Sequence, residues 1–146
     1  GLCIKWHNDL YWHDRKLAGI LIENSLKGSQ LEHSIAGIGL NVNQRFFDAP
    51  HASSLALIIG SDHSLDALLE QILLGIEKNY LHLRQHGPKA LFARYLQHLY
   101  RLGVEAEYSD GELFRGTITG VSPAGLLQIR RASGLFEYDL KEISYC

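Results

Sequence analysis

Several polar residues near the start of the chain have side chains that suit a phosphate-bearing ligand. They are Lys5, Asn8, Asp9, Lys16, Asn41 and Asn43. A lysine ammonium offsets phosphate charge, and the oxygens of Asp and Asn suit a hard cation such as Mg²⁺ or its waters. Asn and Asp are also common in surface turns, because their side chains bond to nearby backbone amides. Spacing alone leaves two interpretations open, a pocket for a phosphate with Mg²⁺ or surface turns with incidental charge, and it favours the second.

Other chemical motifs are not found in the sequence. The eight histidines lack the spacing of metal ligands, and the pair His82 and His86 has no acidic residue between its members as HExxH requires. There is no GxSxG motif and no P-loop. The glycines of Gly37-Ile38-Gly39 lie in a strand pattern rather than in a dinucleotide-binding turn. We therefore expect no metal held by protein ligands alone.

Short extended segments position the first polar residues. Residues 2–6 alternate and are rich in apolar side chains, which predicts a strand that enters a polar turn at residues 7–9. The extended pattern resumes over residues 10–12 and is followed by a second turn at residues 13–16. These segments predict a hairpin with two polar tips.

A longer apolar run follows the hairpin. Residues 17–24 are almost continuously apolar, which is typical of a strand buried on both faces. Gly19 lies inside this run, and an interior strand glycine often marks the close approach of a ligand or another backbone. A turn at residues 27–29 and a return strand over residues 31–43 complete an antiparallel pair. The polar clusters are therefore expected to meet on one sheet.

Two helices are expected after a loop that covers residues 44–61. Ser64 suits a helix N-cap and Asp66 suits the first turn, and an apolar stripe with helical spacing follows. This pattern predicts a helix over residues 64–86 that ends at Gly87. Pro88 opens a second, shorter helix. We expect both apolar stripes to pack on the sheet as core.

The pattern changes after Tyr100. Short strands alternate with turns that contain Gly, Ser and Pro, which is typical of a small all-β barrel. We therefore expect two domains, residues 1–101 and residues 102–146.

Composition limits the class of protein. The formal net charge is −2, 46% of the residues are hydrophobic and 21% are charged, so nothing indicates a nucleic-acid-binding surface. No apolar run approaches the length of a membrane span, and Cys3 and Cys146 show no CxxC spacing. We expect a soluble cytoplasmic protein with reduced thiols. The sequence contains no methionine, which we interpret as the mark of a piece of a longer protein.

Three blocks in order resemble the biotin protein ligase family. They are Lys5-Trp6-His7-Asn8-Asp9-Leu10, Arg15-Lys16-Leu17-Ala18-Gly19-Ile20-Leu21-Ile22-Glu23 and Gly37-Ile38-Gly39-Leu40-Asn41-Val42-Asn43. They are similar to the KWPND, KLAGIL and GIGINVN patterns of the catalytic domain. The resemblance implies an α+β fold, with a mixed, mainly antiparallel sheet backed by helices. This part would be of the class II synthetase and biotin ligase type, but incomplete, and a small SH3-like β-barrel would follow it.

The resemblance also implies an activity. Biotin is activated with ATP and Mg²⁺ to biotinyl-5′-adenylate, and biotin then passes to a lysine of the biotin carboxyl carrier domain of a biotin-dependent carboxylase. Lys16 matches the catalytic lysine that contacts the biotin carboxylate and the α-phosphate, and Gly19 and Ile20 match the biotin pocket. Asn8, Asp9 and Asn41 match positions for the nucleotide phosphates and Mg²⁺, with Lys5 beside them.

The sequence departs from the family pattern in two places. His7 replaces the proline of KWPND, so the turn loses a residue that fixes φ. The Gly/Arg-rich adenylate loop, GRGRxGR, has no counterpart here. We therefore expect very low ligase activity from this chain alone.

Two alternatives stay open from the residues. One is a lipoate–protein ligase, which shares the acyl-adenylate chemistry. The other is a non-catalytic module that dimerises or binds a carrier domain. For the chain itself we expect a homo-oligomer, formed through the open strand edge at residues 37–42.

Overall fold

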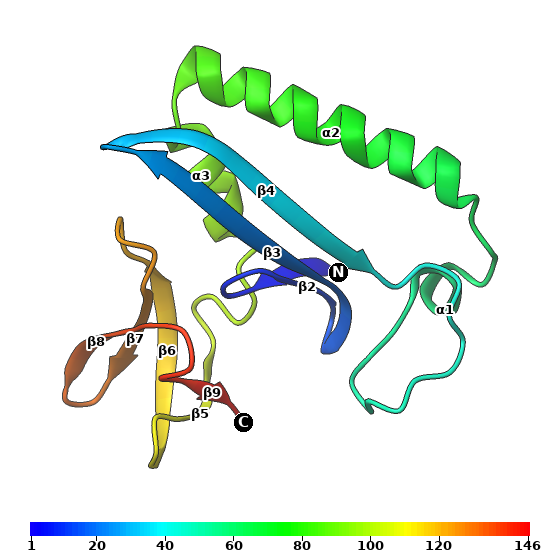
Figure 1. Cartoon of the computed structure of the whole chain (residues 1–146). Coiled ribbons are helices and arrows are strands. Elements are labelled where there is room, and N and C mark those ends of the chain that lie inside the picture. The colour runs from blue at the N-terminus through cyan, green and yellow to red at the C-terminus, as the bar shows by residue number, and fades with distance from the viewer. The chain divides into compact units, whose positions relative to one another are not determined.

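The computed structural model describes residues 1–146, which form two compact units, residues 1–84 and residues 85–146 (Figure 1). The elements in chain order are β1 (Leu2–Lys5), β2 (Asp9–Trp12), β3 (Arg15–Lys27), β4 (Gln30–Leu40), α1 (Leu55–Ile59), α2 (Leu65–His86), α3 (Lys89–Gln97), β5 (Glu105–Ser109), β6 (Leu113–Val121), β7 (Leu127–Arg131), β8 (Gly134–Tyr138) and β9 (Ser144–Tyr145). The expected α+β class is confirmed. The boundary expected at residues 101 and 102 lies inside the second unit and stays a prediction.

The first unit is built on a four-stranded antiparallel sheet with the order β1-β2-β3-β4. Both expected turns are present, but β3 begins at Arg15, so the second turn is shorter than the sequence indicated. A register shift between Leu10 and Tyr11 places Leu10 opposite Ala18 and Tyr11 opposite Lys16. This bulge determines which side chains of β3 share a face with those of β2.

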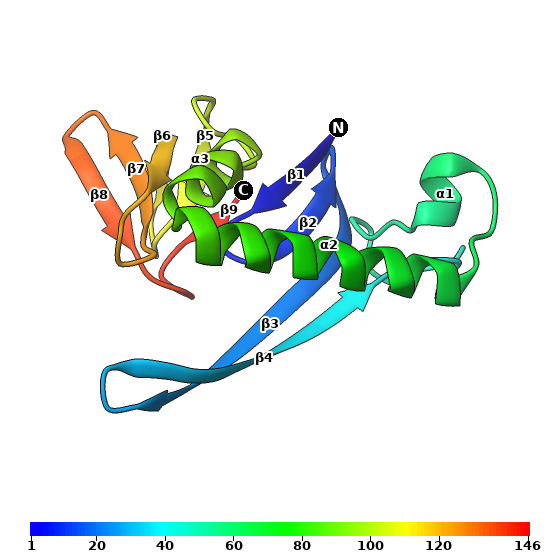
Figure 2. The same cartoon turned by 90° about the horizontal axis from the view of Figure 1, so that it is seen from above.

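The expectation that residues 17–24 are buried on both faces is wrong for most of the run. Leu17 and Ala18 are buried, but Leu21 is 65% exposed and Ile22 is 49% exposed. Figure 2 shows that the tip of the β3–β4 hairpin extends away from α2. No other layer of the unit therefore covers the part of the sheet near the hairpin tip. The apolar run therefore marks an uncovered surface rather than a core strand.

Helix α2 begins where the sequence predicted. The Ser64 carbonyl accepts from the Leu68 amide at 3.1 Å, its hydroxyl lies 3.4 Å from the Ala67 amide, and Asp66 lies in the first turn. The expectation that the apolar stripe is core is wrong, because α2 has no buried residue and Leu69 and Leu73 are each more than half exposed. Only one flank, which includes Leu68 and Ile72, is half-buried. None of the helices combines the length and the apolar character needed to cross a membrane.

The second unit contains a five-stranded antiparallel sheet with the order β8-β7-β6-β5-β9. Its core contains four large side chains with no exposed surface, Tyr108, Ile118, Leu127 and Ile129. Gly116 is required by this packing, because a Cβ at its position would lie 2.6 Å from a methyl carbon of Ile129. The short strands and turns agree with the sequence, whereas the SH3-like assignment stays a prediction.

One charged side chain organises the polar edge of the second sheet. The Arg131 guanidinium lies 3.3 Å from the centroid of the Phe114 ring and donates to the Asp110 carboxylate and the Tyr138 hydroxyl. The bond from Arg131 holds the pKa of the Asp110 carboxyl below its usual value. This cluster joins β7, β8 and the turn after β5.

Candidate functional site

Lys16 and Asp9 form the centre of the site. The Lys16 ammonium donates to the Asp9 carboxylate at 2.7 Å, and both side chains remain partly exposed, at 43% and 33%. Asp9 lies opposite Gly19 and Tyr11 lies opposite Lys16. Because residues two apart on a strand share a face, the bulge brings Lys16, Gly19, Asp9 and Tyr11 to one face. Two residues predicted for the site are thus in direct contact.

Gly19 leaves the space that this ion pair occupies. A Cβ at Gly19 would lie 3.2 Å from an Asp9 carboxylate oxygen and 3.5 Å from the Lys16 ammonium. The first distance is tighter than ordinary van der Waals contact, so a side chain here would push against the pair. The sequence predicted that a ligand or another backbone approaches Gly19, whereas in the structure the Asp9 and Lys16 side chains occupy this place.

Lys5 is next to this centre but has a different contact. Lys5 lies opposite Asp9 in the sheet, and its ammonium is 3.4 Å from the Tyr11 hydroxyl and 5.1 Å from the centroid of the Tyr11 ring. Burial raises the pKa of the Tyr11 phenol, and the nearby Asp9 carboxylate raises it further. Sequence reasoning missed Tyr11, although its place two residues after Asp9 on one strand puts both on the same face.

Asn8 and Ile20 are joined through the backbone. The Asn8 carbonyl accepts from the Ile20 amide at 2.9 Å, and this bond fixes the polar turn beside β3. Ile20 follows Gly19 directly, so its side chain is on the opposite face from the Lys16–Asp9 pair. Only the backbone of Ile20 therefore lies next to the predicted site residues.

Asn41 connects the site to the segment before α1. Its side-chain amide donates to the Ser53 carbonyl at 3.0 Å. The Lys16 amide donates to the His51 carbonyl at 2.6 Å, and the Ser53 amide donates to the Lys16 carbonyl at 2.8 Å. Residues 51–53 thus run as a short parallel partner beside Lys16. No spacing in the sequence indicates this pairing, so the structural role of Ser53 could not be predicted.

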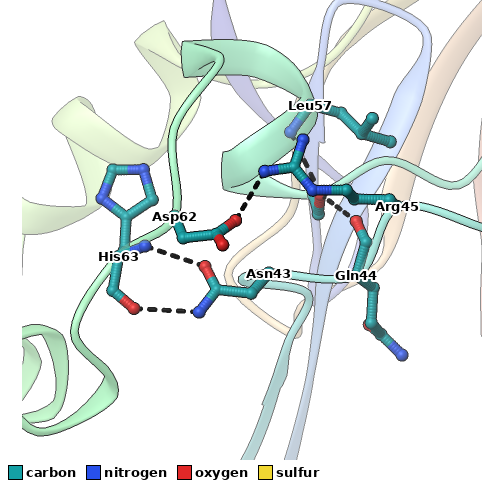
Figure 3. A network of polar contacts seen from close by, with 7 residues as sticks. Asn43, Gln44, Arg45, Leu57, Asp62 and His63 are labelled. Atoms are coloured by element: carbon teal, nitrogen blue, oxygen red, sulfur yellow. Dashed lines mark hydrogen bonds and ion pairs between the residues drawn. The ribbon is translucent and has the colours of Figure 1, made fainter.

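Asn43 serves the loop rather than the ion pair. Figure 3 shows its side-chain amide facing the His63 backbone, where it accepts from the His63 amide and donates to the His63 carbonyl, both at 2.9 Å. Arg45 and Asp62 form an ion pair at 2.6 Å beside it. The Ser54 hydroxyl donates to the Gln44 carbonyl at 2.5 Å. Together these contacts close the base of the segment between β4 and α2.

The carboxylate count limits how a cation could be held. No group of three or more His, Cys, Asp or Glu side chains is placed to bind a metal ion. Asp9 supplies one carboxylate, with Asn8 next to it in the turn. Mg²⁺ is commonly held by one or two carboxylates together with the phosphates of a substrate. The residues present therefore fit a Mg²⁺ that arrives with a phosphate.

Comparison with known proteins identifies relatives of the chain. Residues 2–41, which contain the Lys16–Asp9 pair, match the model of the biotin/lipoate A/B protein ligase family. The apo biotin protein ligase of Aquifex aeolicus has a similar fold, with a TM-score of 0.79 and 28% sequence identity over 99% of this chain. The chain is related to the biotin protein ligases. A bifunctional ligase/repressor BirA of Bacillus spizizenii is 31% identical over 90% of the chain.

The chain covers only part of these biotin protein ligases. It spans 42% of the length of the Bacillus protein and 65% of the Aquifex chain. The Aquifex enzyme has also been solved in complex with biotin and ATP, and that structure matches the chain with a TM-score of 0.76 and 29% identity. The predicted recognition of the family from three sequence blocks is confirmed.

Proposed function

We propose that this chain supplies the C-terminal part of a biotin–protein ligase catalytic domain, followed by an SH3-like domain. The Lys16–Asp9 pair over Gly19 carries the proposal. It lies inside the segment that matches the family, on a face with open space above Gly37 and Gly39, where a Cβ would have no neighbour closer than 3.9 Å. A relative has been solved with biotin and ATP, which are the two substrates we propose.

The proposed reaction has two steps. The biotin carboxylate attacks the α-phosphorus of ATP, so that an acyl–phosphate bond forms and pyrophosphate leaves. The amine of a carrier-domain lysine then attacks the acyl carbon, and AMP leaves. Negative charge builds up on oxygen in both transition states, and a fixed ammonium close to those oxygens lowers both barriers. Lys16 is the residue we propose for this role.

The other predicted residues have supporting roles. Gly19 and the Ile20 backbone would line the biotin pocket, and Asn8, Asp9 and Asn41 would bind the nucleotide phosphates with Mg²⁺. Lys5 would add positive charge at the edge of the same face. Mg²⁺ supplies charge neutralisation on the phosphates when it is bound.

We also propose limits on what the chain does alone. Without a Gly/Arg-rich loop to supply backbone amides and arginines to the adenylate, ligase turnover by these residues should be very low. The carrier domain of a biotin-dependent carboxylase is the proposed acceptor, and the cytoplasm is the proposed compartment.

The edge of the first sheet supports a proposal about assembly. β4 is the last strand in its sheet, and almost all of its residues are exposed. The outer edge of β4 is unpaired and can pair with another copy, so we propose a homo-oligomer through this edge. Of the expected residues 37–42 only 37–40 belong to β4, because the Asn41 and Val42 carbonyls accept from the Leu55 and Ala56 amides. Small-angle scattering tests it, and a monodisperse monomer at high concentration would contradict it.

Ligand titration tests the proposed function. Biotin added to ¹⁵N-labelled protein should shift the amide signals of residues 16–20, and Lys16→Ala should weaken binding at least about tenfold. Lys27→Ala removes the same charge at the far end of β3 and should change nothing. Lipoate should bind more weakly than biotin. If lipoate bound as tightly as biotin or more tightly, the result would favour a lipoate–protein ligase. If neither acid bound, the result would favour a non-catalytic module.

A further inference from the structure

A cavity of the first unit lies on the opposite face of the β2–β3 pair from the Lys16 side chain. Tyr11 is paired with Lys16 and Trp12 with Arg15, and neighbouring residues of a strand point to opposite faces. The volume of the cavity is about 410 Å³, at the small end of the range for ligand pockets. The side chains around it are those of Trp12, His13, Asp14, Arg15, Ser53, Leu57 and Ile58.

Ser53 is the buried polar residue of this cavity. Its side chain is 1% exposed, and its hydroxyl oxygen has no hydrogen-bond partner in the chain. The next residue, Ser54, is just as buried, but its hydroxyl donates to the Gln44 carbonyl and accepts from the Leu57 amide. Buried hydroxyl groups are almost always hydrogen-bonded. The Ser53 hydroxyl is therefore suited to bond to a polar group inside the cavity.

Two opposite charges are adjacent at the mouth of the cavity. The Arg15 side chain is exposed and forms no hydrogen bond or ion pair within the chain, so its guanidinium can take a carboxylate through two parallel hydrogen bonds. Asp14 precedes it, and a carboxylate accepts several hydrogen bonds, so it can bond to an ammonium group in addition to its other contacts. The charges of Asp14 and Arg15 oppose each other for a simple anion or cation. A zwitterion interacts favourably with both.

The remaining wall of the cavity is apolar. The Trp12 indole is half-buried, and the His13 ring packs edge-on against it, with 5.1 Å between the ring centroids and an angle of 81°. Leu57 and Ile58 of α1 complete this wall, and Leu57 is 44% exposed. An apolar group that covers these side chains is removed from water together with them, which favours binding. The occupant should thus carry an apolar part next to its two charges.

We propose that this cavity binds a free α-amino acid with a branched apolar side chain. The amino acid carboxylate bonds to Arg15 and to the Ser53 hydroxyl, its ammonium bonds to Asp14, and its side chain lies against Trp12 and Leu57. The inference goes beyond the proposed function and does not depend on it, because none of these side chains has a role in the proposed reaction.

L-Leucine is the probe, titrated into the ¹⁵N-labelled whole chain. The indole N–H signal of Trp12 should shift and saturate at millimolar leucine, while the indole signal of Trp6, which does not line the cavity, stays in place. 4-Methylpentanoate lacks only the ammonium of leucine, and 3-methylbutylamine lacks only the carboxylate. Each should bind at least about tenfold more weakly than leucine. The absence of a saturable Trp12 shift up to about 10 mM leucine would overturn the inference. Binding of the plain acid as tight as that of leucine would also overturn it.

Two variants test the residues that would hold the carboxylate. Ser53→Ala should bind leucine about tenfold more weakly without lowering the stability of the first unit, because the hydroxyl has no bond to lose in the free protein. Arg15→Gln should weaken binding at least about tenfold, whereas Lys27→Gln, which removes the same charge at the far end of β3, should not change it. Equal losses in Arg15→Gln and Lys27→Gln, or full affinity in Ser53→Ala, would contradict the proposed site.

Biotin separates this site from the proposed function. Biotin is also a carboxylate with an apolar body, but its proposed position is on the other face of the strand pair, so leucine and biotin should bind at the same time. If leucine binds and biotin does not, the inference stands and the proposed ligase role fails. If biotin binds and leucine does not, the reverse holds. Competition between the two ligands would mean that one site takes both, which would overturn the inference.

Discussion

The two units of the chain differ in how they bury their apolar side chains. The second unit has four large side chains with no exposed surface, Tyr108, Ile118, Leu127 and Ile129. In the first unit the buried positions are mostly small, such as Ala18, Ala56, Ser53 and Ser54, while leucines and isoleucines of β3, β4 and α2 are exposed. The unit with the candidate site is therefore the one without a complete core. Exposed apolar surface of this extent is in keeping with the proposed pairing of this unit with another copy.

The largest expected effect on stability comes from a pair of isoleucine substitutions, one in each unit, which tests the difference in burial between the units. Ile129→Ala removes a fully buried side chain and should lower the free energy of unfolding of the second unit by about 2–5 kcal/mol. Ile35→Ala, at a residue that is 60% exposed in β4, should change stability by only about 0.5 kcal/mol or less. Denaturant titration followed by NMR measures the second unit.

The first unit has its own optical signal, because both tryptophans, Trp6 and Trp12, lie in it. Tryptophan fluorescence in the same titration therefore follows that unit alone. Similar losses for the two isoleucine variants would break the comparison between a packed unit and an uncovered one.

Two glycines give the next contrast. Gly116→Ala forces a Cβ to within 2.6 Å of Ile129 and should destabilise the second unit by about 1–3 kcal/mol. Gly37→Ala in β4 meets nothing closer than 3.9 Å and should be close to neutral. Each substitution adds one methyl group to the unaltered protein. If Gly37→Ala lowered the free energy of unfolding as much as Gly116→Ala does, this result would show that β4 is covered in solution.

The fold follows from the sequence where local signals decide it. The turns after β1 and β2 and the cap at Ser64 depend on nearby residues, and all three are found in the structure. The contact between Lys16 and Asp9 could not be derived from spacing, because a bulge between Leu10 and Tyr11 sets the faces. Burial was predicted least well. An apolar pattern shows which face of a helix or strand is suited to packing, but it does not show whether another element covers that face.

A smaller effect is expected at the first turn of α1. The Ser54 hydroxyl accepts from the Leu57 amide at 3.2 Å and donates to Gln44, and the side chain is fully buried. Ser54→Ala should cost about 1 kcal/mol in the first unit, measured by tryptophan fluorescence. Ser64→Ala removes the exposed cap of α2 and should cost less. The opposite order would mean that α1 contributes little to this unit.

The smallest effect depends on pH. Arg131 lowers the pKa of the folded-state Asp110 carboxyl, so its stabilisation is present above the unfolded-state pKa of about 3.9 and is lost as pH falls through the folded-state value. Asp110→Asn should therefore destabilise the second unit at neutral pH, and its difference from the unaltered protein should shrink below about pH 4. If the difference in stability between Asp110→Asn and the unaltered protein stayed constant down to low pH, the ion pair with Arg131 would not make the stability of this unit depend on pH.

The contacts around residues 45–50 have a consequence for which changes of length the chain can tolerate in evolution or in protein engineering. Gln44 is held by Ser54 at one end of this segment, and the His51 carbonyl is held by the Lys16 amide at the other. Between them Phe46 is 93% exposed. Because both ends are anchored separately, residues can be inserted or deleted in between without shifting the strand that carries Lys16. The segment is a place where length can vary at little cost, and it is a natural position for a reporter tag.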